Sequence, residues 1–204
     1  MRTPSGDRGR SALLALCLAI ILTALPAAAL DAEYRIAQNG TSYHAIIELQ
    51  DTERYEFYEP GLLGDRVPLQ VQDVALSGEC SPCEFTWSGN SAITFTRGNY
   101  TLFFTGPLRE NHLMVVFEKP RSVSISLPYG LDVRNPALGM ITPGGIVLPG
   151  ERNETIVAWN NTRTAEIRFY DEGRENILYF FANFWIIIAV VLLLPFLLTW
   201  RRKE

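Results

Sequence analysis

The chain has 204 residues, of which 48% are hydrophobic, and a formal net charge of −4. Residues 30–176 carry 12 Lys and Arg against 20 Asp and Glu, which gives this part a net charge of −8. This acidic balance argues against a nucleic acid or an anionic surface as the partner.

The N-terminus predicts a secretory signal over residues 1–29. Three arginines precede the apolar run SALLALCLAIILTALP, and the small residues AAA after its proline form a cleavage-site pattern. An uncleaved anchor is the alternative, because the apolar run is nearly long enough to span a bilayer. Cys17 would leave with a cleaved signal, so Cys80 and Cys83 would be the cysteines of the mature protein.

Residues 30–176 predict one extracytoplasmic domain, an antiparallel β-sandwich of the Ig-like or a similar kind. Apolar and polar residues alternate with a period of two, and no sustained helical periodicity is present. About nine or ten short strands with regularly spaced turn signals are typical of such a sandwich. The expected turns lie at 39–40, where Asn-Gly favours a type I′ hairpin, and at 98–99, 119–121 and 160–161.

Four Asn-x-Ser/Thr sequons occur in this part of the chain. Each matches the N-glycosylation acceptor, and such a bulky modification needs an exposed segment of an extracytoplasmic protein. The alternative is that polar turn residues match the pattern by chance. The candidate acceptors are Asn39, Asn99, Asn153 and Asn160.

The motif GECSPCEF contains the pair Cys80 and Cys83. A redox pair needs a lowered thiol pKa, usually at a helix N-terminus or beside a cation, whereas Glu79 and Glu84 flank this pair and strand-like segments surround it. A zinc site needs four ligands, so it would require a second chain or distant histidines. A disulfide that stabilises a turn is therefore favoured outside the cytoplasm, with thiol–disulfide exchange and an interchain bridge or metal site as alternatives.

No set of residues predicts catalysis. The sequence lacks a G-x-S-x-G elbow, an H-E-x-x-H helix and a phosphate-binding glycine loop. His44 and His112 lack metal-ligand spacing, so structural roles are expected for both. We therefore expect no enzyme activity, no catalytic residue, no metal and no cofactor.

Residues 128–150 contain four prolines and five glycines. This composition predicts a long ordered loop or a pair of short edge strands. Such a segment either carries binding function or covers a sheet edge against the addition of another strand. The sequence leaves both roles open.

Residues 177–200 predict a transmembrane helix without a single charge. At about 1.5 Å per residue, the segment is roughly 36 Å long and crosses a hydrocarbon core of about 30 Å. The tail RRKE at 201–204 is expected in the cytoplasm by the positive-inside rule. The predicted localisation is a cell membrane, with the lipid bilayer as a partner and an envelope or membrane protein as a further candidate partner.

The segment VSISLPYGLDVRNPALGMITPGG, then ETIVAWNNTRTAEIRFY and the terminal helix, resembles a family of archaeal membrane-anchored proteins of unknown function. An LP-x-G turn, a PGG turn and a V-x-W strand carry the resemblance, over about residues 122–195. It implies an archaeal cell envelope and transfers no catalytic residue. We therefore expect a membrane-anchored β domain with a binding or structural role, and the alternative is a membrane-tethered thiol–disulfide protein that uses Cys80 and Cys83.

Overall fold

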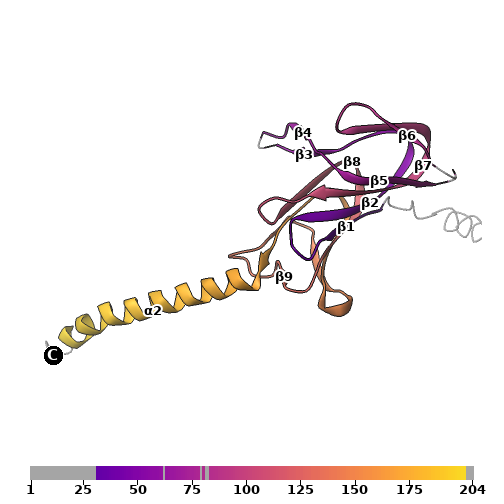
Figure 1. The fold of residues 1–204 in the computed structure, drawn as a ribbon. Helices are drawn as coiled ribbons and strands as arrows, with labels where there is room; N and C mark the ends of the chain where they lie inside the picture. Colours follow the sequence, from indigo (N-terminus) through magenta and orange to yellow (C-terminus); the bar gives the residue numbers. More distant parts are fainter. Residues whose placement is uncertain (1–30, 62, 79, 81–82, 201–204) are drawn as a thin grey trace, which may run out of the picture.

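A computed structural model describes residues 31–61, 63–78, 80 and 83–200 of the chain. The predicted signal segment, residues 1–29, and the predicted cytoplasmic tail, residues 201–204, lie outside the described residues. The described part consists of a β domain from which one long helix extends (Figure 1). The expectation of a mainly β fold with an apolar C-terminal helix is confirmed.

The elements follow one another along the chain as short and long strands, one 3-10 turn and one helix. They are β1 (Asp31–Ile36), β2 (Ser42–Glu56), β3 (Tyr58–Pro60), β4 (Arg66–Pro68), β5 (Gln72–Gly78), β6 (Phe85–Trp87), β7 (Ala92–Pro107), β8 (His112–Leu127), β9 (Leu131–Asp132), β10 (Met140–Ile141), β11 (Ile146–Pro149), η1 (Glu151–Asn153), β12 (Thr155–Arg168), β13 (Tyr170–Asp171) and α2 (Glu172–Trp200).

Nine of the described strands form one mixed sheet in the order β10-β12-β8-β1-β2-β7-β5, with β11 also on β12 and β6 also on β7. Strand β1 pairs antiparallel with β2 and parallel with β8. The prediction of a wholly antiparallel fold is therefore wrong at the β1–β8 pair. Six strands separate β1 from β8 in the chain, and such a long connection allows a parallel pairing. The Ig-like arrangement stays a prediction.

Three of the four predicted turns are bends inside long strands. Residues 98–99 lie within β7, residues 119–121 within β8 and residues 160–161 within β12. The pairing registers shift at these places, and Asp51 and Asn161 adopt left-handed φ angles of 49° and 57°. A residue in this conformation forms a β-bulge, which bends a strand without ending it. The turn-forming residues thus bend two long antiparallel strand pairs, β2–β7 and β8–β12.

The Asn-Gly pair at 39–40 does join two strands, β1 and β2, as predicted. The turn differs from the expected type I′, since Gly40 is the residue with a positive φ, 66°, and its N–H donates to the carbonyl oxygen of Ala37 at 2.9 Å. A single left-handed glycine after a turn is typical of the longer hairpin loops.

Alternating side chains of the long strands form the core. Ile47 on β2, Leu102 on β7, Ile125 on β8 and Ile167 on β12 are each fully buried. Burying an aliphatic side chain of this size contributes about 1.5–3 kcal/mol. The core therefore holds the two antiparallel strand pairs, β2–β7 and β8–β12, together.

Residues 128–150 form the edge strands that were one of the two predicted arrangements. Strands β10 and β11 both pair with β12, so the segment covers one edge of the main sheet. The indole N–H of Trp159 donates to the carbonyl oxygen of Thr142 at 3.3 Å, and a Cβ on Gly145 would approach that indole ring to 2.7 Å. The PGG turn thus packs directly on the tryptophan of the V-x-W strand.

Helix α2 begins five residues earlier than the predicted start at 177. The backbone N–H of Arg174 donates to the Asp171 carboxylate at 2.8 Å, which is the contact of an N-terminal cap. The helix therefore follows β13 without a separate linker. Its Glu172–Leu194 stretch has a mean hydropathy of 2.7, is long and apolar enough to cross a membrane, and is covered by none of the described residues.

Candidate binding cleft

The β domain has a cleft between β2 and β8, near the bends of both strands, that could hold a ligand. The cleft consists of two adjoining cavities of about 490 Å³ and about 510 Å³. Both volumes are in the range of small-molecule sites, about 300–1,000 Å³. The cavities share a wall formed by Tyr55, Glu56, Tyr58, Val116 and Phe117. We call the first cavity the charged half of the cleft and the second the aromatic half.

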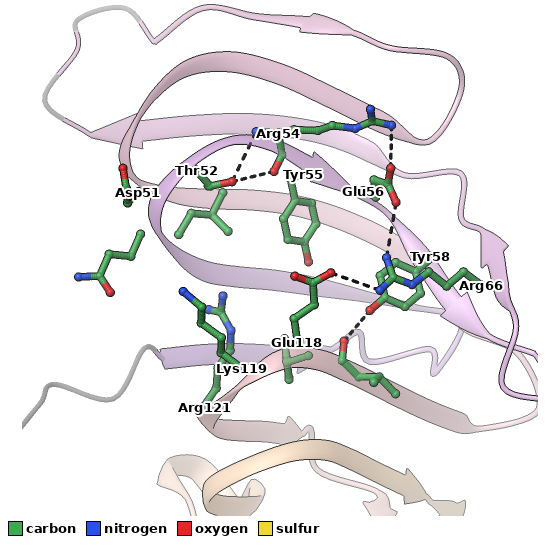
Figure 2. A pocket seen from close by; sticks show the side chains of 14 residues that line it. Asp51, Thr52, Arg54, Tyr55, Glu56, Tyr58, Arg66, Glu118, Lys119 and Arg121 are labelled. Carbon is green, nitrogen blue, oxygen red and sulfur yellow. Dashed lines mark hydrogen bonds and ion pairs between the residues drawn. The ribbon is translucent and has the colours of Figure 1, made fainter.

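The charged half contains four cations and three carboxylates, in a domain that is acidic as a whole. Arg54 pairs with Glu56 at 2.7 Å, and Arg66 pairs with Glu118 at 3.2 Å. The Arg66 guanidinium also lies 4.7 Å from the centre of the Tyr58 ring. These contacts occupy two of the cations, and Figure 2 shows them along one side of the cleft.

Arg121 is placed differently from those two arginines. One of its guanidinium nitrogens donates to the backbone carbonyl oxygen of Glu48, and the guanidinium lies 5.2 Å from the centre of the Phe117 ring. Among the described residues, no carboxylate lies within ion-pair distance of it. In Figure 2 the Arg121 guanidinium and the Tyr55 ring point into the same space from opposite walls. Its positive charge is therefore available to a ligand.

The aromatic half is lined by a continuous chain of rings. Tyr34 contacts Tyr43 with a ring-centre distance of 5.7 Å, and Tyr43 contacts Phe104 at 6.1 Å. Phe57 lies 5.0 Å from Phe104 and 5.2 Å from Tyr55. These are tilted and edge-to-face pairs, the geometries that aromatic quadrupoles favour. The rings give the cavity an apolar surface suited to a flat ligand.

The tyrosine hydroxyls around the cleft fall into two groups. The Tyr58 hydroxyl donates to the carbonyl oxygen of Val116 at 3.1 Å. The hydroxyls of Tyr34, Tyr43 and Tyr55 make no hydrogen bond to any described residue, although Tyr34 is only 2% exposed and Tyr43 only 5%. No fully enclosed side-chain nitrogen or oxygen of the described residues lacks a partner, so these three hydroxyls reach the cavity space.

Burial keeps these phenols protonated. It raises the pKa of Tyr34, Tyr43 and Tyr55 well above the ordinary value, with further raising contributions from neighbouring tyrosines. The positive charge of Arg121 opposes this rise in the pKa at Tyr34 and Tyr55. A neutral phenol can donate a hydrogen bond, so the cleft combines one available guanidinium with three O–H donors.

The two histidines have the hydrogen-bond partners expected of structural residues. His44 shares a hydrogen bond with the Thr105 hydroxyl at 3.0 Å, on the neighbouring strand. His112 lines the aromatic half, and its Nε2 lies 2.8 Å from the Glu166 carboxylate on β12. Groups of His, Cys, Asp or Glu that could hold a metal ion are absent from the described part of the chain.

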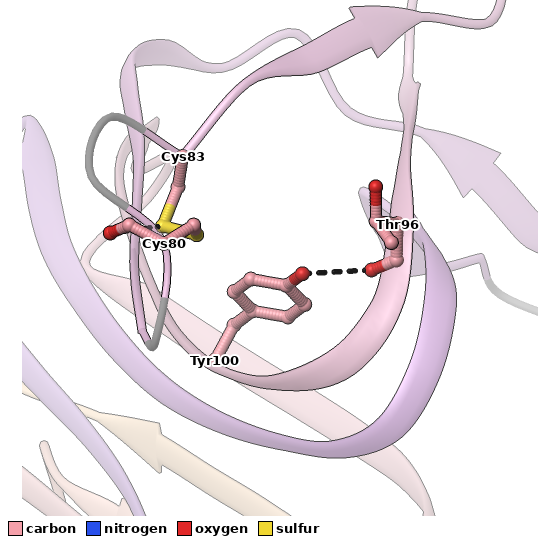
Figure 3. The surroundings of a disulfide bond; sticks show 4 residues. All are labelled: Cys80, Cys83, Thr96 and Tyr100. Atoms are coloured by element: carbon pink, nitrogen blue, oxygen red, sulfur yellow. Dashed lines mark hydrogen bonds between the residues drawn. A yellow bond between two sulfur atoms is a disulfide. The ribbon is translucent and has the colours of Figure 1, made fainter.

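Cys80 and Cys83 lie at disulfide distance, with their Cα atoms 4.9 Å apart (Figure 3). The pair follows β5 and precedes β6, so strands and not a helix N-terminus lie beside it in the described chain. Tyr100 lies next to the pair, and its hydroxyl donates to the carbonyl oxygen of Thr96 at 2.8 Å. Neither cysteine lines the cleft.

The four candidate glycosylation residues are all exposed. Asn39 lies in the β1–β2 turn and Asn153 in η1, whereas Asn99 and Asn160 lie in the bends of β7 and β12, where hairpin turns were expected. The side-chain oxygen of Asn99 accepts a hydrogen bond from the backbone N–H of Asp51 at 2.9 Å. Exposure is compatible with modification, and the acceptor role stays a prediction.

Sequence reasoning did not identify the cleft. Its residues come from strands far apart in the chain, and their pairing was not predicted. The available signal was the set of tyrosines at 34, 43, 55 and 58. Aromatic residues in strands are usually core residues, and only the folded structure shows that the hydroxyls of Tyr34, Tyr43 and Tyr55 have no partner among the described residues.

A model described as a family of unknown function, DUF5803, matches residues 86–203. The matched region begins within β6, includes α2 and contains Arg121, while Cys80 and Cys83 precede it. No curated protein matches the chain.

Proposed function

The chain belongs to the DUF5803 family of unknown function, and we propose that it is a single-pass membrane-anchored binding protein of the cell envelope. In this proposal residues 30–176 lie outside the cytoplasm, residues 177–200 cross the lipid bilayer and residues 201–204 face the cytoplasm. The protein binds a ligand and catalyses no reaction.

The observation that carries the binding role is the cleft. It presents an arginine without a carboxylate partner and three phenol hydroxyls that reach the cavity and have no hydrogen-bond partner among the described residues. A ligand in the cavity can accept hydrogen bonds from these donors, and so the arrangement favours binding over a purely structural role.

The apolar helix supports the anchoring. Tyr179, Phe180, Phe181 and Trp185 are at least half exposed near its domain end. Aromatic side chains are enriched where a spanning helix crosses the headgroup region. Since α2 follows β13 directly, the β domain would lie close to the bilayer surface.

The resemblance to archaeal membrane-anchored proteins extends the proposal to an archaeal envelope. The Arg-over-Lys bias, 16 to 2, is compatible with that origin. The four exposed sequons would then carry glycans on the outer face. Glycan attachment would be detected as a mass increase of the mature chain that disappears in Asn→Gln variants.

Cysteine labelling in intact cells tests the topology. Ser88→Cys places a thiol in an exposed turn of the β domain, and Glu204→Cys places one at the C-terminus. A membrane-impermeant maleimide should label Ser88→Cys in intact cells and Glu204→Cys only after lysis, with the wild-type chain as the blank. Reversed labelling, or a chain in the soluble fraction, would contradict the proposed anchoring.

Extraction of the purified full chain tests the binding role. The chain is isolated from its native membrane in mild detergent and denatured, and the released small molecules are measured by mass spectrometry. We expect one compound in about equimolar amount, absent from protein-free detergent. A chain that releases nothing and gains no thermal stability from any extract of the native cells would contradict a binding role.

A further inference from the structure

We infer that the cleft binds a small organic acid, with its anionic group at Arg121 and a flat apolar body along the aromatic half. This inference rests on the binding role proposed above and adds the chemical class of the ligand. The contacts around Arg121, the Tyr55 hydroxyl in the same cavity and the ring-lined aromatic half each define one part of that ligand.

The charge of the ligand follows from the pairing of the cations. Arg54 and Arg66 are held by Glu56 and Glu118, at 2.7 Å and 3.2 Å. Arg121 uses one nitrogen on a backbone carbonyl and keeps the rest of its guanidinium free of carboxylates within the described residues. A guanidinium offers five N–H donors in a planar fork, which matches a carboxylate or phosphate. The position therefore favours an anion.

The Tyr55 hydroxyl completes an oxyanion site beside Arg121. Both residues line the charged half, and in Figure 2 the Tyr55 ring and the Arg121 guanidinium point into the same space. The Tyr55 O–H group is a donor without an acceptor among the described residues. A ligand oxygen near Arg121 can accept from the guanidinium and from a phenol together, and hydrogen bonds to an ionised acceptor are roughly twice as strong as neutral ones.

The body of the ligand follows from the aromatic half. Its rings stand 5.0–6.1 Å apart from centre to centre along Tyr34, Tyr43, Phe104 and Phe57. The cavity of about 510 Å³ begins at the wall that it shares with the charged half. A flat apolar group that continues from the anionic end would contact these rings. Either a soluble aromatic acid or an acidic lipid has this chemistry.

The test uses the full chain in nanodiscs of a zwitterionic lipid and the probe 2-naphthoate, a flat water-soluble carboxylate. Equilibrium dialysis, with naphthoate fluorescence as the readout and empty nanodiscs as the blank, should show saturable binding of one molecule per chain. The neutral analogue 2-naphthalenemethanol should bind at least about tenfold more weakly, because it lacks the charge that Arg121 recognises.

Variants assign the site. Arg121→Gln should weaken naphthoate binding by about ten- to a hundredfold, the range for a lost charge-assisted hydrogen bond. Arg121→Lys keeps the charge and should recover most of the affinity. Arg35→Gln is the matched control, because Arg35 lies on β1, pairs with Glu33 at 2.7 Å, and neither of these two residues lines the cleft. It should leave binding unchanged.

The outcomes separate the inference from the proposed function. Equal binding of the acid and the neutral analogue, or binding unaffected by Arg121→Gln, would overturn the inference, whereas a compound released from the native chain would still support a binding role. Absence of saturable naphthoate binding would also overturn it. Displacement of naphthoate in phosphatidylglycerol nanodiscs would identify the natural acid as a lipid, and unchanged binding there would identify it as a soluble compound.

Discussion

The cleft and the disulfide corner, which comprises Cys80, Cys83, Thr96 and Tyr100, differ in how their polar groups are satisfied. In the corner the Tyr100 hydroxyl donates to the Thr96 carbonyl oxygen, and the two cysteines lie at disulfide distance from each other. In the cleft three phenols have no partner among the described residues. The polar groups of the corner thus have partners within the protein, whereas the phenol hydroxyls of the cleft can still donate hydrogen bonds to a ligand.

This difference has consequences for stability. A hydrogen bond within the protein adds about 1 kcal/mol to stability, whereas a hydroxyl that reaches the cavity without a partner among the described residues adds little. Changes in the corner should therefore lower stability and leave binding unaffected, whereas changes at the free hydroxyls should leave stability nearly unchanged and weaken binding.

Alkaline pH should produce the largest effect. Burial raises the pKa of Tyr34, Tyr43 and Tyr55, so these phenols stay protonated in the folded chain and ionise on unfolding above their ordinary pKa of about 10. Stability is then fully present below pH 10 and is lost as pH rises. At pH 11 each phenol costs about 1.4 kcal/mol, or about 4 kcal/mol for the three.

Urea unfolding of the full chain at pH 9 and pH 11 would measure this loss, and absorbance at 295 nm would follow the phenol ionisation. Lysine adds little to the titration, since Lys119 is the single lysine of residues 30–176. The Tyr55→Phe variant should lose about a third of the effect. Ordinary ionisation of all tyrosines near pH 10 in the folded chain would contradict the described burial of the cleft.

Replacement of both cysteines by serine should lower the free energy of unfolding by about 2 kcal/mol, the chain-entropy value for so short a loop. Naphthoate binding should be unchanged, because neither cysteine lines the cleft. We also expect a reduction potential below about −300 mV, typical of a structural bridge. A potential near −200 mV would instead favour the alternative of a thiol–disulfide protein.

Tyr58→Phe and Tyr100→Phe form a matched pair. Each change removes a hydroxyl that donates to a backbone carbonyl oxygen, at 3.1 Å and 2.8 Å, so each should cost about 1 kcal/mol of stability. Only Tyr58 lines the cleft, and only its replacement should alter naphthoate affinity. An equal change of naphthoate affinity in both variants would mean that affinity depends on the stability of the fold and not on contact between the tyrosine and the ligand.

Local sequence signals predicted where the chain departs from straight strands. They did not predict whether the chain reverses there or only bends. The Asn-Gly pair at 39–40 reverses the chain between β1 and β2, whereas the Gly-Asn pair at 98–99 and the Asn-Asn pair at 160–161 only bend their strands. Both kinds of site need residues that tolerate turn-like backbone angles. The partner strand decides between them, because β2 continues past the bend of β7 and β8 past that of β12.

The apolar helix and the strand-rich domain could be predicted, because length and periodicity carry that information locally. The cleft could not, since its walls come from strands that are distant in the chain, and β1, which carries Tyr34, lies beside β8 only through a parallel pairing. This pairing joins segments about ninety residues apart, and nothing in either segment specifies it. The missing hydroxyl partners of Tyr34 and Tyr43 are likewise visible only in the folded chain.

The smallest effect on stability is expected from Tyr34→Phe. The variant keeps the buried ring and removes a hydroxyl without a partner, so the free energy of unfolding should change by less than about 0.5 kcal/mol or should increase. Naphthoate affinity should fall several-fold in the same variant. A loss of about 1 kcal/mol, as in Tyr58→Phe, would mean that the Tyr34 hydroxyl already has a hydrogen-bond partner in the free protein. Tyr34 would then resemble Tyr100 of the corner, and the proposed difference between cleft and corner would be wrong for this residue.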